Sequence, residues 1–188
     1  MEKTNKNIIK IAITGPESTG KTTLAKTLAS YFKTTWAEEY SREYLNKLKG
    51  NYTFYDLTEI AKGQLQNIKK AEENANKIFF ADTELLVIKI WSIYKYNVCS
   101  KFILDNIKTQ NFNLYLLTYP DLEWEYDPLR EAPSNEMRQE LFDIYRTELE
   151  NYNFTYEIIK GKGETRFQNA LKAIKKHFSN TLIKYQLF

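Results

Sequence analysis

Apolar positions along the chain follow two alternating patterns: short continuous apolar runs, and longer segments with an apolar residue every three or four positions. The continuous runs are rich in β-branched and aromatic residues, which is typical of strands buried in a parallel sheet. They predict strands at residues 8–14, 78–81 and 114–118, and residues 34–37 and 155–159 are candidates for two further, short strands. The spaced pattern predicts helices at residues 22–32, 56–75, 85–94, 102–107, 136–152 and 164–178, and another that begins within residues 38–44.

Strands that alternate with helices at this spacing predict an α/β fold with a five-stranded parallel sheet, covered by helices on both faces in three layers. Ligands of such sheets bind at the carboxyl ends of the strands. No repeat or linker interrupts the pattern, so we expect residues 1–188 to form a single domain. Residues 119–134 combine acidic residues, an arginine, a tryptophan and prolines without periodicity, and we interpret them as a short lid.

Composition limits the classes of partner. The net charge is +3 with 27% charged residues, which indicates neither a nucleic-acid-binding surface nor an acidic tail. Cys99 is the only cysteine, so the chain has no internal disulfide and fits a reducing compartment. The polar first ten residues lack the apolar region of a signal peptide, and no window of about 20 residues is apolar enough to span a bilayer. We expect a cytoplasmic protein that binds a small molecule, either as a monomer or as a homo-oligomer.

A phosphate-binding motif follows the first predicted strand. Residues 15–22 read G-P-E-S-T-G-K-T and match G-x-x-x-x-G-K-[ST], placed between a strand and a helix as the motif requires. Backbone N–H groups of such a loop surround phosphate oxygens, and the helix adds its positive N-terminal end. Lys21 is expected to reach the β- and γ-phosphates of ATP, and the Thr22 hydroxyl to ligate Mg²⁺. The predicted nucleotide-binding residues are Gly15, Glu17, Ser18, Thr19, Gly20, Lys21, Thr22 and Thr23.

A carboxylate at the end of the third predicted strand is the candidate second metal ligand. Asp82 follows the apolar run at residues 78–81, which places it at the carboxyl edge of the sheet. There it can meet a phosphate-bound Mg²⁺ directly or through water. The alternative is that Asp82 caps the helix predicted at residues 85–94, and both roles can coexist.

Four further charged residues are candidates for catalysis. Glu39 and Arg42 lie three positions apart just after the second strand, so a starting helix can project both into one cleft, where Glu39 can accept a proton from an attacking hydroxyl. The alternative is a solvated surface pair. Arg130, in the predicted lid, can stabilise the transferring phosphoryl group as the site closes. Arg138 is a second candidate for this role, and for either arginine the alternative is a surface position without a role.

Aromatic residues near these charges are candidates for contact with a flat substrate ring. We select Trp36, Tyr40 and Trp124, and the neighbouring Tyr126 offers a further ring. The alternative is packing in the core or in the lid, because large aromatic side chains more often serve there.

Four motifs together resemble the ribosylnicotinamide kinase domain of bifunctional NAD-biosynthesis proteins and its stand-alone bacterial ATP-binding relatives. They are the phosphate loop and the sequences E-Y-S-R-E-Y at 39–44, A-D-T-E at 81–84 and W-E-Y-D-P-L-R at 124–130. The resemblance covers nearly the whole chain and implies a P-loop kinase fold. It implies transfer of the γ-phosphate of ATP to the 5′-hydroxyl of nicotinamide riboside, which yields nicotinamide mononucleotide.

The resemblance also assigns roles to individual residues. Lys21 and Thr22 would hold ATP-Mg²⁺, and Asp82 and Arg130 match the strand-end acid and the lid arginine. Glu39 and Arg42 match the acid and arginine that follow the second strand. One departure concerns the aromatic position: bifunctional members have a tryptophan directly before the Glu-Tyr pair, where this chain has Glu38, and Trp36 stands two positions earlier.

Two other functional classes remain open at this point. The chain can be a kinase for another nucleoside or small metabolite, because a few polar contacts distinguish related nucleosides. It can also be a regulatory ATP-binding protein that hydrolyses ATP slowly. A nucleic-acid-dependent NTPase is disfavoured by the modest charge.

Overall fold

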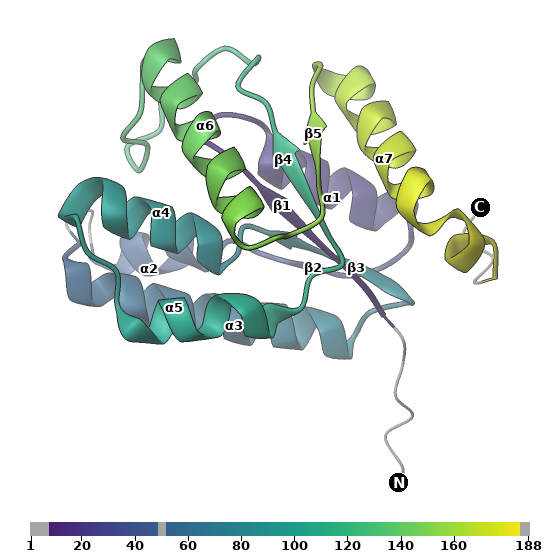
Figure 1. The fold of residues 1–188 in the computed structure, drawn as a ribbon, viewed down its shortest axis with the longest axis horizontal. Helices are drawn as coiled ribbons and strands as arrows, with labels where there is room; N and C mark the ends of the chain where they lie inside the picture. The colour runs from purple at the N-terminus through teal and green to yellow at the C-terminus, as the bar shows by residue number, and fades with distance from the viewer. Residues whose placement is uncertain (1–7, 49–51, 185–188) are drawn as a thin grey trace, which may run out of the picture.

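The computed structural model describes residues 8–48 and 52–184. Within these ranges five strands form one sheet, in which every neighbouring pair is parallel, in the order β2-β3-β1-β4-β5 (Figure 1). The strands are β1 (Ile9–Thr14), β2 (Trp36–Ala37), β3 (Ile78–Asp82), β4 (Leu114–Thr118) and β5 (Tyr156–Ile159). The predicted five-stranded parallel α/β fold is confirmed.

The helices connect successive strands as the periodicity predicts. They are α1 (Lys21–Tyr31), α2 (Tyr40–Leu48), α3 (Phe54–Glu73), α4 (Leu85–Tyr96), α5 (Lys101–Ile107), the 3₁₀ turn η1 (Lys108–Gln110), α6 (Asn135–Asn151) and α7 (Gly163–Lys184). Helix α3 begins two residues before the predicted start, because Thr53 caps it and Asp56 completes a reciprocal capping box. Helix α7 continues six residues beyond the predicted end at residue 178, and the buried Leu182 packs in the core there.

Helices cover both faces of the sheet in the predicted three layers (Figure 1). Helices α1 and α7 pack on one face, where Leu28 and Ile174 contact the cluster around Ile11 and Ile13 of β1. Helices α3, α4, α5 and α6 cover the other face, where Ala12 of β1 lies in the same cluster as residues of α4 and α6. This division follows from the alternation of side chains along β1, which is buried between two neighbouring strands.

The parallel register brings the ends of three chain segments to one edge of the sheet. Ile13 of β1 pairs with Asp82 of β3, and Thr14 pairs with Leu117 of β4. The phosphate loop after β1, the acid that ends β3 and the segment at residues 119–134 after β4 therefore leave the sheet side by side. The candidate site forms where they meet.

The membrane expectation can be compared with the structure over part of the chain. Across residues 8–48 and 52–184, no helix combines the length and the apolar character needed to cross a bilayer. The polar N-terminal stretch that we interpret as lacking a signal peptide lies mostly outside the described residues.

Candidate active site

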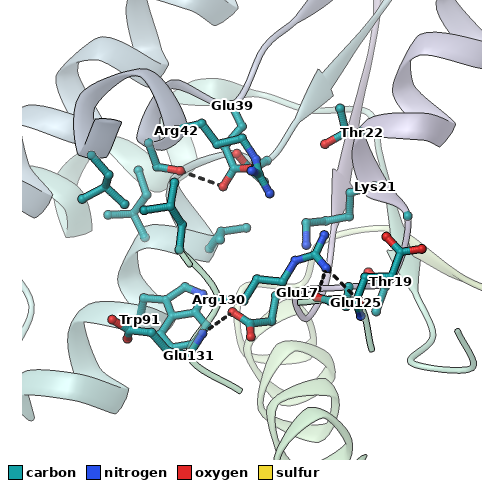
Figure 2. A pocket seen from close by; sticks show the side chains of 18 of the residues that line it. Glu17, Thr19, Lys21, Thr22, Glu39, Arg42, Trp91, Glu125, Arg130 and Glu131 are labelled. Carbon is teal, nitrogen blue, oxygen red and sulfur yellow. Dashed lines mark hydrogen bonds and ion pairs between the residues drawn. The ribbon is translucent and has the colours of Figure 1, made fainter. Parts of the chain in front are cut away.

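A pocket of about 390 Å³ opens at the carboxyl edge of the sheet (Figure 2). It lies between the phosphate loop, the ends of α2, α3 and α4, and residues 119–134, which we call the lid segment. Polar residues line the part near the phosphate loop and apolar residues line the part between the helices. The lining residues used below are Glu17, Ser18, Thr19, Gly20, Lys21, Thr22, Thr23, Glu39, Arg42, Leu45, Tyr52, Leu57, Ile60, Gln64, Thr83, Val87, Ile88, Trp91, Leu129, Arg130 and Glu131.

The phosphate loop requires glycine at two positions. Gly20 precedes α1 with a φ of 75°, in the left-handed region, and Gly15 has a φ of 130°. A Cβ on Gly15 would lie 2.7 Å from Oγ1 of Thr118, so β4 leaves no space for a side chain there. The Thr19 hydroxyl lies 2.7 Å from the Pro16 carbonyl oxygen and 2.6 Å from the Thr118 hydroxyl. These contacts fix the loop against the end of β4.

Lys21 projects into the pocket from the first turn of α1 (Figure 2). Its ammonium donates to the carbonyl oxygens of Gly15 (3.0 Å) and Pro16 (2.7 Å). Loss of hydration lowers the pKa of this ammonium, while the negative charges of Glu39 and Asp82 act in the opposite direction. A cation that is poorly hydrated and held by neutral carbonyls is suited to exchange them for phosphate oxygens.

Asp82 and Thr22 form a pair next to Lys21. The Thr22 hydroxyl donates to Oδ2 of Asp82 at 2.6 Å. The other oxygen, Oδ1, is buried and has no partner among the described residues. Burial, together with the negative charge of Glu39, raises the pKa of Asp82 to about 6. A hydroxyl oxygen beside an unpartnered carboxylate oxygen fits a hard divalent cation such as Mg²⁺.

Glu84, not Asp82, caps α4. Its carboxylate accepts a hydrogen bond from the Leu86 N–H at 2.6 Å. The Thr14 hydroxyl and the Gln110 amide also donate to it, each at 3.3 Å. The alternative interpretation of Asp82 as the cap is therefore not observed, and its carboxylate remains available at the pocket.

Glu84 makes a pH-dependent contribution to stability. Complete burial raises its pKa from the ordinary 4.5 to about 7. As pH rises from 4.5 to 7 the unfolded chain releases the proton first, so this group destabilises the fold progressively over that window. The Glu84→Gln variant keeps the shape and removes the charge. We expect the free energy of unfolding of Glu84→Gln, taken relative to that of the wild type, to increase by on the order of 3 kcal/mol as the pH rises from 4.5 to 8.

Urea unfolding at pH 5 and pH 8 would check this expectation. A chelator keeps divalent ions from the nearby Asp82. The exposed Glu59, which pairs with Lys62 on the surface of α3, provides a Glu59→Gln control without pH-dependent gain. If the free energy of unfolding of the wild type and of Glu84→Gln changed by the same amount between pH 5 and pH 8, the raised pKa of Glu84 would be contradicted.

Glu39 and Arg42 lie together at the rim of the pocket (Figure 2). Nε of Arg42 is 3.5 Å from Oε2 of Glu39, and the Ser41 hydroxyl donates to Oε1 at 2.8 Å. Arg42 also donates to Oδ2 of Asp127 in the lid segment at 2.8 Å. The pair therefore lines the pocket and contacts the lid segment, while 44% of the Arg42 side chain is exposed to solvent.

The lid segment contacts the phosphate loop directly. The Glu17 carboxylate accepts hydrogen bonds from the backbone N–H groups of Glu131 (3.0 Å) and Ala132 (2.6 Å). Arg130 donates to the Ser18 hydroxyl at 3.3 Å and to the Glu125 carbonyl. The guanidinium of Arg130 thus points into the cavity on the same side as Lys21 (Figure 2).

Arg138, the second arginine candidate, has a structural position. It is buried in α6 and donates to the Leu122 carbonyl at 2.9 Å and to Asn135. It does not line the pocket. Arg138 therefore holds the start of the lid segment against α6.

None of the three aromatic side chains selected from the sequence lines the pocket. Trp36 packs against the core cluster on the α1 face, with the Lys26 ammonium 5.3 Å from its ring. The Tyr40 ring lies against Gly63 of α3, and the Trp124 ring packs 6.1 Å from Tyr126. Their observed role is packing, which was the alternative interpretation.

Trp91 and Tyr52 are the aromatic residues of the pocket, and sequence analysis does not select them. They join an apolar wall from α2, α3, α4 and the lid segment, made of Leu45, Leu57, Ile60, Val87, Ile88 and Leu129. On helices these residues follow the same three-to-four spacing as core residues. The periodicity therefore could not distinguish the wall of a cavity from the core.

Comparison with known proteins places the chain in a family. A model of the AAA domain family matches residues 10–166. The chain belongs to this family. It is also 30% identical over 172 residues to the trifunctional NAD biosynthesis/regulator protein NadR of Escherichia coli (strain K12), covering 88% of this chain and 42% of the relative. The chain thus spans less than half the length of the curated relatives it matches.

Solved structures of NadR share the fold. A NadR structure in complex with NR has a TM-score of 0.73 at 20% identity and covers 91% of this chain and 51% of that chain. A NadR structure in complex with NAD and AMP-PNP has a TM-score of 0.71 at 22% identity and covers 91% of this chain and 50% of that chain. The resemblance to NAD-biosynthesis proteins and their P-loop relatives is confirmed, as is the P-loop kinase architecture.

Proposed function

We propose that this protein is an ATP- and Mg²⁺-dependent kinase that transfers the γ-phosphate to the 5′-hydroxyl of nicotinamide riboside. The observation that carries the proposal is the two-part pocket. A phosphate loop with Lys21 forms one part, and an apolar wall with Trp91 forms the other. A pocket with this division suits a nucleotide phosphate next to the flat aromatic ring of a nucleoside. The NR and AMP-PNP in the NadR structures support this pairing of ligands.

The residues of the phosphate loop would bind and orient ATP. Backbone N–H groups of the loop and the N-terminal end of α1 bind the phosphate oxygens, and Lys21 neutralises charge at the β- and γ-phosphates. Thr22 and Asp82 would hold Mg²⁺, which supplies neutralisation of phosphate charge when bound.

Glu39 would act on the acceptor. Its carboxylate accepts the proton of the acceptor hydroxyl as that oxygen bonds to the γ-phosphorus and ADP leaves. Arg42 and Ser41 orient the carboxylate through the contacts at 3.5 Å and 2.8 Å. Arg130 stabilises the negative charge of the transferring group from the lid segment, which we propose closes over residues 15–22.

An acceptor assay tests the proposal. Purified protein with ATP and Mg²⁺ would be supplied with nicotinamide riboside, adenosine, uridine or thymidine, and ADP and phosphorylated nucleoside would be measured. We expect nicotinamide riboside to give the highest kcat/KM. Turnover with another nucleoside only would keep the mechanism and change the substrate. ATP hydrolysis that no acceptor stimulates would refute the kinase and favour a regulatory ATP-binding protein.

A further inference from the structure

Gln64 joins two loops of the candidate active site. It lies in α3, is 1% exposed and lines the pocket. Its Oε1 accepts a hydrogen bond from the Tyr40 N–H at 2.8 Å, and its Nε2 donates to the Thr83 carbonyl at 3.2 Å. Tyr40 directly follows Glu39, and Thr83 directly follows Asp82. One amide therefore connects the segments that carry the two carboxylates nearest Lys21.

Each of these two backbone groups depends on Gln64. Tyr40 is the first residue of α2, so its N–H has no partner within the helix. Thr83 has a φ of 68°, a left-handed conformation that is strained for a β-branched residue. Strain of this kind persists where the surroundings hold the backbone, which is common at functional sites. Gln64 satisfies the first group and holds the second together with the hydrogen bond from the Thr83 N–H to the Ile13 carbonyl at 3.1 Å.

Gly63 contributes to the same connection. A Cβ on Gly63 would lie 2.1 Å from Cε1 of the Tyr40 ring, so that ring rests on the backbone of α3. A glycine within a helix lowers the stability of the helix relative to alanine. The close approach of the ring explains why α3 has a glycine at this position. The pair Gly63–Gln64 thus holds Tyr40 through both its ring and its N–H.

Glu39 needs this support because the sheet holds it weakly. Strand β2 has two residues and its ladder with β3 ends at Ala37, so Glu39 lies beyond the sheet. A proton acceptor must nevertheless lie within hydrogen-bond reach of the acceptor hydroxyl. A misplacement of about 1 Å can cost on the order of 100-fold in rate.

We propose that Gln64 is a positioning residue that sets Glu39 relative to Asp82 for transfer to the acceptor. The inference rests on the proposed kinase function. It implies that loss of Gln64 uncouples ATP consumption from phosphorylation of the nucleoside, because water can still attack while the acceptor hydroxyl is no longer aligned with Glu39.

Gln64→Met is the informative variant, since methionine has a similar length and no amide. Gln110→Met is the matched control. Gln110 is a buried glutamine that bonds to the Leu85 N–H and the Ile107 carbonyl, and also to the Glu84 carboxylate at 3.3 Å, and it does not line the pocket. Both variants lose a buried amide, so a purely structural effect would lower the Tm of both without distinguishing them.

Amide hydrogen exchange tests the contact without any need for turnover. We expect the Tyr40 N–H to exchange at least tenfold faster in Gln64→Met than in the wild type, and at the wild-type rate in Gln110→Met. Equal Tyr40 exchange in the wild type and Gln64→Met would overturn the inference, whether or not the protein phosphorylates a nucleoside.

The ratio of ADP formed to nucleoside phosphorylated tests the role, and it is independent of the folded fraction. We expect Gln64→Met to raise this ratio and to lower kcat by about 10- to 100-fold, with the KM for ATP within about threefold of the wild type. Gln110→Met should keep the wild-type ratio. Faster Tyr40 exchange with an unchanged ratio would refute positioning. If the wild type phosphorylated no acceptor, the kinase proposal would be refuted. The exchange rate of the Tyr40 N–H would then still test its hydrogen bond to Gln64.

If Gln64→Met does not fold, Gly63→Ala tests the position of Glu39 and Tyr40 through a different substitution. The added methyl group must displace the Tyr40 ring while Gln64 stays in place. We expect the same increase in the ratio of ADP to product. A folded Gly63→Ala protein with the wild-type ratio would contradict the dependence of Glu39 on Tyr40.

Discussion

Replacement of Lys21 by alanine is expected to reduce ATP-dependent phosphoryl transfer by about 100- to 1000-fold. The ammonium lies within the phosphate loop, bound to two of its carbonyls, at the point where the γ-phosphate would lie. The ammonium would neutralise negative charge that develops on the transferring group, so most of the loss should appear in kcat. Steady-state assays with the preferred acceptor would measure it.

We expect the Lys21→Ala protein to fold like the wild type, so that its loss of activity reports on the phosphate site and not on unfolding. The loss of hydration that lowers the pKa of Lys21 is a cost of folding that alanine removes. Lys26→Ala provides a control on the same helix, because Lys26 lies outside the pocket and packs its ammonium over the Trp36 ring. Near-normal turnover in Lys21→Ala would overturn the phosphate-site assignment.

Replacement of Asp82 by asparagine is expected to lower activity by about 100-fold and to stabilise the protein in the absence of metal. The amide keeps an oxygen that can accept from the Thr22 hydroxyl and removes the charge offered to Mg²⁺. Burial raises the pKa of Asp82 to about 6, so above that pH the wild type carries an unfavourable charge that asparagine lacks.

Two measurements check the predicted loss of activity and the predicted gain in stability: turnover as a function of Mg²⁺ concentration, and unfolding in the presence of a chelator. The Mg²⁺ concentration for half-maximal activity should rise in Asp82→Asn, and the unfolding midpoint in chelator at pH 8 should rise as well. Asp105→Asn is the control, since Asp105 is an exposed residue of α5 paired with Lys101. An unchanged Mg²⁺ requirement would exclude Asp82 as a metal ligand.

Local sequence signals were sufficient for the fold and for the phosphate loop. Continuous apolar runs predict β1, β3 and β4, which are buried along nearly their whole length, because a strand buried on both faces has no polar face. The glycine positions and Lys21 follow from a motif whose residues are neighbours in the chain, so spacing alone specifies the geometry. Element ends were less accurate: α3 starts at a capping box that begins at Thr53, and α7 ends at Lys184.

The tertiary structure alone decided which side chains share the pocket. Trp36 and Trp91 are equally aromatic in sequence, yet the alternation along β2 turns Trp36 toward the α1 face, while α4 brings Trp91 to the cavity. The same holds for Gln64, whose partners Tyr40 and Thr83 are 24 and 19 residues away in the chain. The sequence by itself determined which segments form strands, helices and the phosphate loop, because those depend on neighbouring residues. Contacts among α3, β2 and β3 depend on packing between distant segments, which no local pattern encodes.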